Sequence, residues 1–214
     1  MEDHTSSGLW MELVGTGQTN YQDRAAAVLS LSGVLGAWWG DNASPDRVDL
    51  PRRMPEFATL AIFETDESFE APPPAGRGDI GLHFARTRRP GQGIVTGRET
   101  SGVLLVLISP KEPSAATRLR DWADFVHIRQ IAASSVPGYT MITPYENTGA
   151  GPRYLHLYEM DSDDPEATFA SMTPIVGARL GPEGSKAFDE WAWHPDLRIE
   201  YVNTFKRTGA LLRV

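Results

Sequence analysis

The chain has 214 residues, 41 % of them hydrophobic, and a formal net charge of −8 with a pI near 5.1. A chain of this size can bury a sizeable core without help from a metal or a disulfide. Its negative charge disfavours sequence-independent binding to nucleic acid, which depends on lysine and arginine. The sequence has no cysteine, which excludes disulfides, thiolate nucleophiles and iron–sulfur ligation and fits a reducing cytoplasm.

The sequence shows no signal for export or membrane insertion. Residues 1–4 are acidic and polar, and no apolar run approaches the roughly 20 residues that a membrane helix requires. The one basic cluster, which includes Arg86 and Arg98, is more economically explained as a solvated strand end and loop. We therefore expect a cytoplasmic protein with no nucleic-acid or membrane partner.

The first half of the chain predicts an incomplete set of elements. Strands are expected at residues 8–14, 34–40, 57–65 and 81–88, with an alanine-rich helix at 20–31. Where a second helix would be expected, the sequence has only the short polar run 67–71, followed by three prolines and Gly76. The first half is therefore predicted to lack most of its second helix.

The second half, after a glycine-rich linker at 92–102, predicts a complete set. Strands are expected at 103–109, 139–145, 154–160 and 198–206, and helical stretches at 113–136, 165–180 and 185–191. Asp164 is an N-cap, Pro165 occupies the first helical position and Gly181 ends that helix. The order strand, helix, strand, strand, helix, strand is that of a ferredoxin-like unit.

Three pairs of segments match in the same order along the chain. They are 33–42 with 138–147, 60–66 with 155–161, and 83–91 with 201–209. The matches predict an α+β fold of two tandem ferredoxin-like (βαββαβ) units whose antiparallel sheets form an intramolecular α+β barrel. Residues 1–91 would be the degenerate unit and residues 103–214 the complete one, with a cavity between the two copies.

Three runs in the second half resemble the dimeric α+β barrel superfamily, especially its EthD-like branch. They are Trp122–Ile128, Val136–Tyr139 and Gly151–Glu159, in which a helix with an aromatic, an acid and a histidine leads to a Pro-Gly turn and a strand. The resemblance covers residues 103–207 well and 8–91 in degenerate form. It implies a pocket between the sheet and its covering segments, suited to aromatic or polycyclic molecules, and it leaves a homodimer open.

The superfamily includes cofactor-free monooxygenases, lactone isomerases, polyketide cyclases, dehydratases and haem enzymes, so the resemblance does not choose a reaction. The sequence has no phosphate-binding glycine loop, zinc-binding helix, serine elbow or EF-hand loop. No metal site is predicted.

Alternation along residues 153–159 supplies the first candidate site residues. Tyr154, His156 and Tyr158 share one face and are predicted to point into the barrel, while Leu155 and Leu157 pack under helices. A buried imidazole at His156 can act as an acid or base near neutral pH. The alternative is a core histidine that is satisfied by hydrogen bonds.

The last strand adds further candidates for a polar and aromatic lining. Tyr201 and Asn203 share a face there, and His83 is the matching residue of the first half. Each tyrosine could equally be a large core side chain whose hydroxyl needs a partner.

His127 presents a conflict between the resemblance and the helical wheel. The resemblance nominates it, with Asp124 as its orienting carboxylate. On a wheel of about 100° per residue, however, it falls opposite the apolar stripe that contains Trp122 and Phe125. A straight helix would place His127 in solvent, and a break or bend would turn it into the cavity mouth.

Arg129 lies on the apolar side of the same wheel, and Arg24 occupies the matching place in the first half. A buried guanidinium must find a carboxylate, carbonyls or an anionic ligand. A repeated structural ion pair is favoured over a substrate contact.

The favoured hypothesis is a cofactor-independent enzyme that acts on a hydrophobic aromatic or polyketide-like small molecule. His156 or His127 would move a proton, giving an isomerase, lyase, cyclase or monooxygenase reaction, with a tyrosine or Asn203 stabilising an enolate oxygen. The alternatives are a haem-binding enzyme of the same superfamily and a non-catalytic small-molecule-binding protein.

Overall fold

The structure is a computed structural model, which describes residues 6–15, 21–74, 76–87 and 100–212. Its centre is a closed antiparallel barrel of eight strands, paired in the order β1-β3-β2-β8-β5-β7-β6-β4. The strands are β1 (Gly8–Val14), β2 (Val34–Asn42), β3 (Thr59–Thr65), β4 (Ile80–Arg86), β5 (Gly102–Pro110), β6 (Tyr139–Asn147), β7 (Tyr154–Met160) and β8 (Leu197–Leu212).

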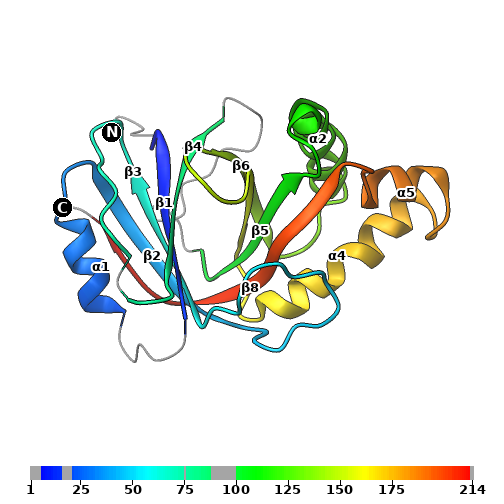
Figure 1. The fold of residues 1–214 in the computed structure, drawn as a ribbon. Helices are drawn as coiled ribbons and strands as arrows, with labels where there is room; N and C mark the ends of the chain where they lie inside the picture. Colours follow the sequence, from blue (N-terminus) through cyan, green and yellow to red (C-terminus); the bar gives the residue numbers. More distant parts are fainter. Residues whose placement is uncertain (1–5, 16–20, 75, 88–99, 213–214) are drawn as a thin grey trace.

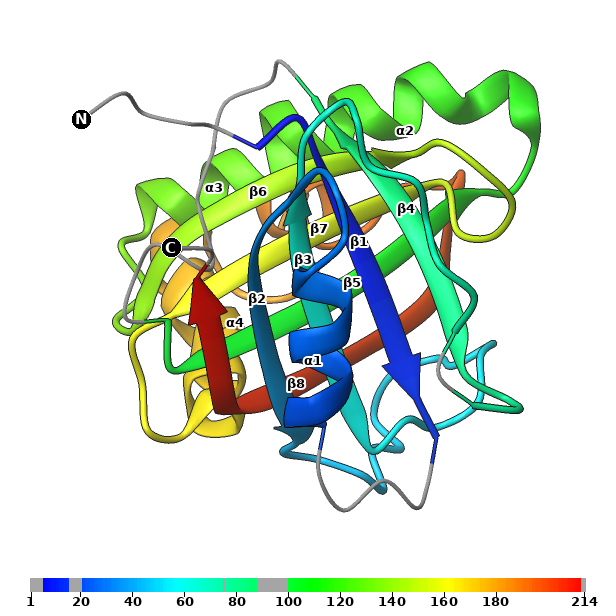
Figure 2. The same ribbon diagram turned by 90° about the vertical axis from the view of Figure 1, so that its left-hand side faces the viewer.

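Helices cover the outside of the barrel (Figures 1 and 2). They are α1 (Gln22–Leu29), the 3-10 turn η1 (Pro113–Ala115), α2 (Ala116–Trp122), the π-helical turn η2 (Ala123–Ile128), α3 (Arg129–Ala133), α4 (Pro165–Leu180) and α5 (Lys186–Ala192). Figure 1 shows α1 on the side of β1–β3, and α2, α4 and α5 on the opposite side, over β5 and β8. Among the described residues, no helix has the length and apolar character needed to cross a bilayer.

Most element positions agree with the prediction from the sequence. β1 and β7 have the predicted bounds, and α4 begins at Pro165 after Asp164, whose side chain accepts a hydrogen bond from Ala167 N–H at 2.9 Å. The described residues between β3 and β4, 66–74 and 76–79, contain no helix, in agreement with the prediction for that segment. Most of the predicted linker lies outside the described residues.

Two seams close the barrel within one chain. β2 pairs with β8 from Gly36 opposite Leu212 to Asn42 opposite Phe205, and β4 pairs with β6 through Phe84, Ala85 and Arg86. Starting from β4, the ring reads β4-β1-β3-β2 and then β8-β5-β7-β6, so both halves have the same relative order. Because closure removes sheet edges, no second chain is needed to complete the barrel, and the homodimer stays a prediction.

The barrel interior is packed with large apolar side chains. Met11, Trp38, Leu105, Leu157 and Phe205 belong to this interior cluster, and each is fully buried. A separate cluster on the outer face, including Leu104, Tyr158 and Val202, packs under the helices of the second half. Both faces of the second-half sheet are therefore buried, one inside the barrel and one beneath helices.

Candidate functional site

The face assignment predicted for β7 is wrong, although its alternation is confirmed. Leu155 and Leu157 point into the barrel, whereas Tyr154, His156 and Tyr158 lie on the outer face beneath the helices. All seven residues of β7 are buried, because the barrel interior covers one face and the helical layer covers the other. Strand alternation separates two faces but does not say which of two buried faces is the interior.

A cavity of about 570 Å³ lies between the outer face of β5, β7 and β8 and the covering helices. The predicted cavity in the barrel interior is therefore replaced by one between the second-half sheet and its covering helices, the location that the family resemblance implied. The lining is mostly apolar and aromatic and includes His127, His156, Tyr158, Trp122, Trp191, Leu104, Val106, Phe169, Met172, Phe188, Val202, Asp49 and Leu50.

The π-helical turn η2 brings His127 into this cavity. Residues 123–128 form i→i+5 turns between α2 and α3, so successive side chains advance by less than the 100° of an α-helix. This change rotates His127 away from the solvent-facing position that a regular wheel gives it. The bend that the sequence left open is thus present at the residue in question, and π-turns are frequent at functional sites.

His127 is held by hydrogen bonding and by ring stacking. Its Nδ1 lies 3.0 Å from the carbonyl oxygen of Trp191, so Nδ1 carries the hydrogen and donates it, because a carbonyl can only accept. The imidazole is parallel to the Trp191 ring within 5°, with the ring centroids 5.5 Å apart, and the centroid of the Trp122 ring lies 5.2 Å from that of the imidazole. Burial lowers the pKa of His127, and the Trp191 hydrogen bond acts in the opposite direction.

This arrangement leaves Nε2 of His127 as a lone-pair nitrogen. The group that orients the ring is the Trp191 carbonyl, not the Asp124 carboxylate predicted for that role. Asp124 is buried and lines a different hollow, beside Tyr139 and Thr140 of β6. Its charge acts instead on Tyr158, as described below.

His156 lies on β7 near His127 and is almost completely buried. Burial, together with the neighbouring His127, lowers the pKa of His156 to about 3. Its imidazole is therefore neutral at neutral pH and can give or accept a hydrogen bond. Within the described residues, neither ring nitrogen has a hydrogen-bond partner, so the predicted alternative of a satisfied core histidine is not supported.

Tyr158 lines the same cavity two residues further along β7. Burial raises the pKa of its hydroxyl, and the charge of Asp124 raises it further. The hydroxyl therefore stays protonated and can donate. His127, His156 and Tyr158 are the sequence-predicted candidates that the fold brings together.

Three other predicted lining residues are engaged elsewhere. Tyr154 shares the outer face of β7 with His156 but lies under α2, where its hydroxyl donates to the Ala116 carbonyl at 2.9 Å. Tyr201 and Asn203 point to the opposite side of β8, where both donate to Glu56 Oε1, at 2.8 and 3.2 Å. Tyr201 and Asn203 do point inward as predicted, but into the packed barrel interior and not into the His127 cavity.

His83 lies on the outer face of β4 in the first half, near Phe69 and hydrogen-bonded to Thr148, and it does not line the His127 cavity. The sequence match had paired Ala85 with Asn203. In the structure, Met11 lies between Ile62 and Leu82 of its two neighbouring strands. Leu105 lies between Leu157 and Asn203 in the same way. Because Ile62 matches Leu157 in the sequence, the structural counterpart of Asn203 is Leu82. The match of the last strands was therefore shifted by an odd number of residues, which exchanges the two faces.

Arg129 and Arg24 differ, although the sequence treated them as equivalents. Arg24 pairs with the fully buried Glu12, which also accepts a hydrogen bond from Tyr21, so the structural ion pair is confirmed for the first half. Arg129 is exposed at the edge of the hollow beside β6. The π-turn just before it shifts its position on the helix, so the predicted burial of Arg129 is wrong.

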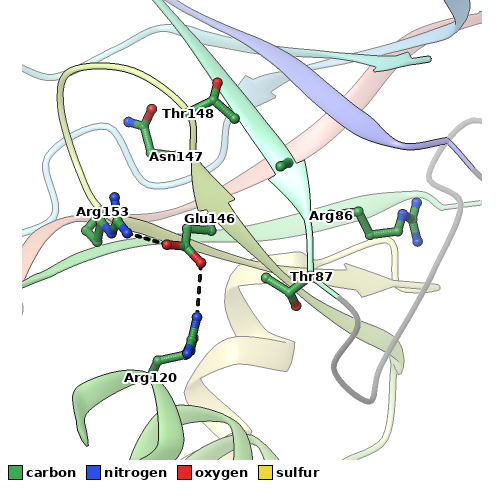
Figure 3. A pocket seen from close by; sticks show the side chains of 8 residues that line it. Arg86, Thr87, Arg120, Glu146, Asn147, Thr148 and Arg153 are labelled. Carbon is green, nitrogen blue, oxygen red and sulfur yellow. Dashed lines mark hydrogen bonds and ion pairs between the residues drawn. The ribbon is translucent and has the colours of Figure 1, made fainter. Parts of the chain in front are cut away.

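A further hollow, of about 560 Å³ and distinct from the one lined by Asp124, lies beside the turn after β6 (Figure 3). Arg120 and Arg153 both point to Glu146 there, and Arg120 Nη1 lies 3.1 Å from its carboxylate. Its central charges are thus already paired with each other. No sequence-predicted site residue lines this hollow, so the cavity of His127 and His156 is the stronger candidate.

Sequence reasoning missed part of the cavity wall. Asp49 and Leu50 come from the proline-rich segment between β2 and β3 in the first half, and no local pattern in that segment indicates that it reaches the cavity. The helical wheel placed Trp122 on an apolar stripe without indicating that it lines a cavity. A π-turn at His127 could have been suspected from the conflict between the resemblance and the wheel.

Comparisons with known proteins support the fold. No protein-family model matches the sequence, and no curated protein gives a significant match. An anthrone oxidase-like protein of known structure aligns with a TM-score of 0.53 at 13% identity, over 97% of this chain and 93% of its own. A candidate monooxygenase from Fusobacterium nucleatum subsp. nucleatum aligns with a TM-score of 0.53 at 8% identity, over 98% and 96%. At such identities the likeness shows the α+β barrel fold alone.

Proposed function

We propose that the chain is a cofactor-independent enzyme that removes a proton from a flat, hydrophobic small molecule bound in the His127 cavity. The observation that carries the proposal is the geometry of His127, whose tautomer is fixed by Trp191 and whose free Nε2 belongs to a ring that lines an apolar cavity. A positioned base with a third group that orients it is the arrangement typical of acid–base catalysis.

His127 is the better candidate for the base, and His156 for a neutral hydrogen-bonding partner. The pKa of about 3 makes His156 a weak base. Burial also lowers the pKa of His127, but the hydrogen bond to Trp191 opposes that shift, and no such hydrogen bond from a described residue acts on His156. Two neighbouring imidazoles disfavour a second positive charge, so one proton is held at a time. Tyr158 would donate to the oxygen on which negative charge develops.

The lining supports an aromatic or polyketide-like substrate. Trp122, Trp191, Phe169 and Phe188 offer ring faces and edges, and aliphatic side chains of β5 and β8 form the floor. A C–H group that is flanked by aromatic rings and conjugated through them with a carbonyl is acidic enough for an imidazole base. Because similarly folded proteins are described as anthrone oxidase-like and as a candidate monooxygenase, oxygenation is the first reaction to test.

The haem alternative fits the cavity poorly. A haem needs an axial ligand, which His156 could supply, and partners for its two propionate carboxylates. The ionised residues that line this cavity are Asp49 and Glu183, and both would repel carboxylates. The sequence alternative of a haem enzyme is therefore not favoured here.

We also infer that the chain is a tandem of two ferredoxin-like units in the dimeric α+β barrel superfamily. The equal strand order of the two halves supports this origin, as does the position of Ile62 and Leu157 opposite Met11 and Leu105. The EthD-like branch rests on the sequence runs alone. An alignment of homologues with single-unit proteins would test the duplication.

The function is tested with anthrone, a flat tricyclic ketone with an acidic methylene between its rings. The chain should catalyse deuterium exchange at that methylene in D₂O under argon, followed by NMR. In air, anthrone and dioxygen should give anthraquinone and water. His127→Gln should lower the exchange rate by at least about 100-fold, the usual contribution of a general base.

His83→Gln is the matched control, since it removes an imidazole on the other half of the barrel. His156→Gln and Tyr158→Phe should have smaller effects than His127→Gln. Unchanged exchange in both the His127 and the His156 variants would reject the proposal. Anthrone that raises the melting temperature without exchanging would favour the non-catalytic binding protein instead.

A further inference from the structure

The segment between β2 and β3, residues 43–58, is here called the strap. It belongs to the first half of the chain, yet Figure 1 shows it running beside β8 and α4. Two backbone hydrogen bonds of 2.9 Å fix it along β8, from Ala43 N–H to the Thr204 carbonyl and from Arg53 N–H to the Glu200 carbonyl. The strap therefore reaches the strand that forms part of the cavity floor.

Arg47 holds the middle of the strap. Its side chain is only 4% exposed, and it pairs with Glu166 in the first turn of α4 and with Asp49 at 3.2 Å. Its Nε donates to Asn203 Oδ1 of β8 at 3.2 Å. The guanidinium also lies 4.8 Å from the centre of the Phe169 ring. One buried cation thus connects strap, strand and helix, and a buried arginine is stable only when so paired.

These contacts place two strap residues in the cavity wall. Asp49 and Leu50 line the cavity together with Phe169 of α4, and Leu50 packs against the apolar cluster beneath the helices. Val48, two residues before Leu50, is 93% exposed. The carboxylate of Asp49 is paired with Arg47. Leu50 is therefore the strap residue whose apolar side chain would contact a ligand in the cavity.

We propose that the strap is a wall of the ligand site, in which Leu50 determines which ligands fit and Arg47 is the residue that positions Leu50. The proposal rests on the proposed function only in taking the cavity as the ligand site, and it requires no turnover. A wall held in place before binding costs no ordering when the ligand arrives, which favours affinity. The degenerate first half would thus have a direct part in specificity.

The test uses N-phenyl-1-naphthylamine, a neutral apolar fluorophore, titrated into the full chain. Leu50→Trp should fill the wall and weaken binding of the fluorophore at least about tenfold, as added volume in a fitted pocket does. The matched control is Val48→Trp, which adds the same ring at the exposed position. Its affinity should stay within about twofold of the parent chain.

Arg47→Met should weaken binding about tenfold by releasing the strap. Arg52→Met is its control, because Arg52 pairs with Glu56 inside the strap and is 39% exposed. Thermal unfolding checks that each variant folds, and the Leu50→Trp comparison decides the matter if Arg47→Met does not fold.

Equal affinities of the Leu50→Trp and Val48→Trp chains would overturn the proposal, as would a parent chain that does not bind the fluorophore. The two proposals fail separately. If Leu50→Trp weakens binding of the fluorophore but the parent chain does not exchange anthrone, the strap proposal stands and the enzymatic proposal is rejected. If the parent chain exchanges anthrone and Leu50→Trp changes neither the exchange rate nor the affinity, only the strap proposal is rejected.

Discussion

His127 donates its Nδ1 hydrogen to the carbonyl oxygen of Trp191, 3.0 Å away, while the two rings of these residues lie parallel. The backbone of α5 thereby sets the tautomer of a histidine in η2. A carbonyl orients an imidazole as a carboxylate does, but without adding a negative charge to an apolar cavity.

The first prediction concerns this tautomer. In the folded chain at pH 8, His127 should be neutral with its hydrogen on Nδ1, because Nδ1 faces an acceptor that cannot donate. Long-range ¹H–¹⁵N correlation spectra distinguish the two nitrogens, and the His127→Gln chain assigns the signals. A neutral ring with the hydrogen on Nε2 would remove the lone pair that the proposed base needs.

The second prediction concerns the pH dependence of stability. Below about pH 6.5 the unfolded chain protonates His156, whereas the folded chain, with a pKa of about 3 at this residue, does not. The unfolded state then binds more protons, so stability falls as the pH falls from about 6.5 toward 3 and is unaffected by this residue above pH 7. Between pH 7 and pH 5 the loss should be about 2 kcal/mol.

Urea unfolding at these two pH values measures that loss, and His156→Gln should remove most of it. The lowered pKa of His127 acts in the same direction, so some pH dependence should remain. A His156→Gln chain that loses as much stability as the parent would show that the imidazole is not buried in its neutral form.

The strand and helix positions could be predicted from the sequence because local signals determine them. Asp164, Pro165 and Gly181 define α4, and alternation defines the two faces of β7. The choice between the faces could not be predicted. It depends on which layer covers each face, and Leu157 and His156 are equally buried on opposite sides.

The candidate site was predicted in part for the same reason. His156 and Tyr158 were found as a pair because they share a face, even though that face was assigned to the wrong layer. Leu50 and Arg47 could not be found, since their positions follow from the path of a loop across β8. Nothing local in residues 43–58 encodes the neighbour that they meet.

The third prediction concerns the buried charge of the first half. Glu12 is fully buried and is paired with Arg24, so Arg24→Met should leave an uncompensated carboxylate and cost about 3–5 kcal/mol of unfolding free energy. Glu12→Gln combined with Arg24→Met removes both charges and keeps an acceptor for Tyr21. The double variant should recover much of the loss in urea unfolding. If it is as unstable as Arg24→Met alone, the charge is not the cause.

The last prediction tests the seam between β2 and β8. Gly209 lies opposite Trp39, and a Cβ at position 209 would come within 2.0 Å of the indole ring. Gly209→Ala should therefore destabilise the chain by about 1–3 kcal/mol, because the ring must leave its place over the strand. Trp39→Leu removes that ring, so Gly209→Ala should cost much less in the Trp39→Leu background. Thermal unfolding of the four chains completes the cycle, and additive losses would mean that Gly209 is required by its backbone and not by the indole.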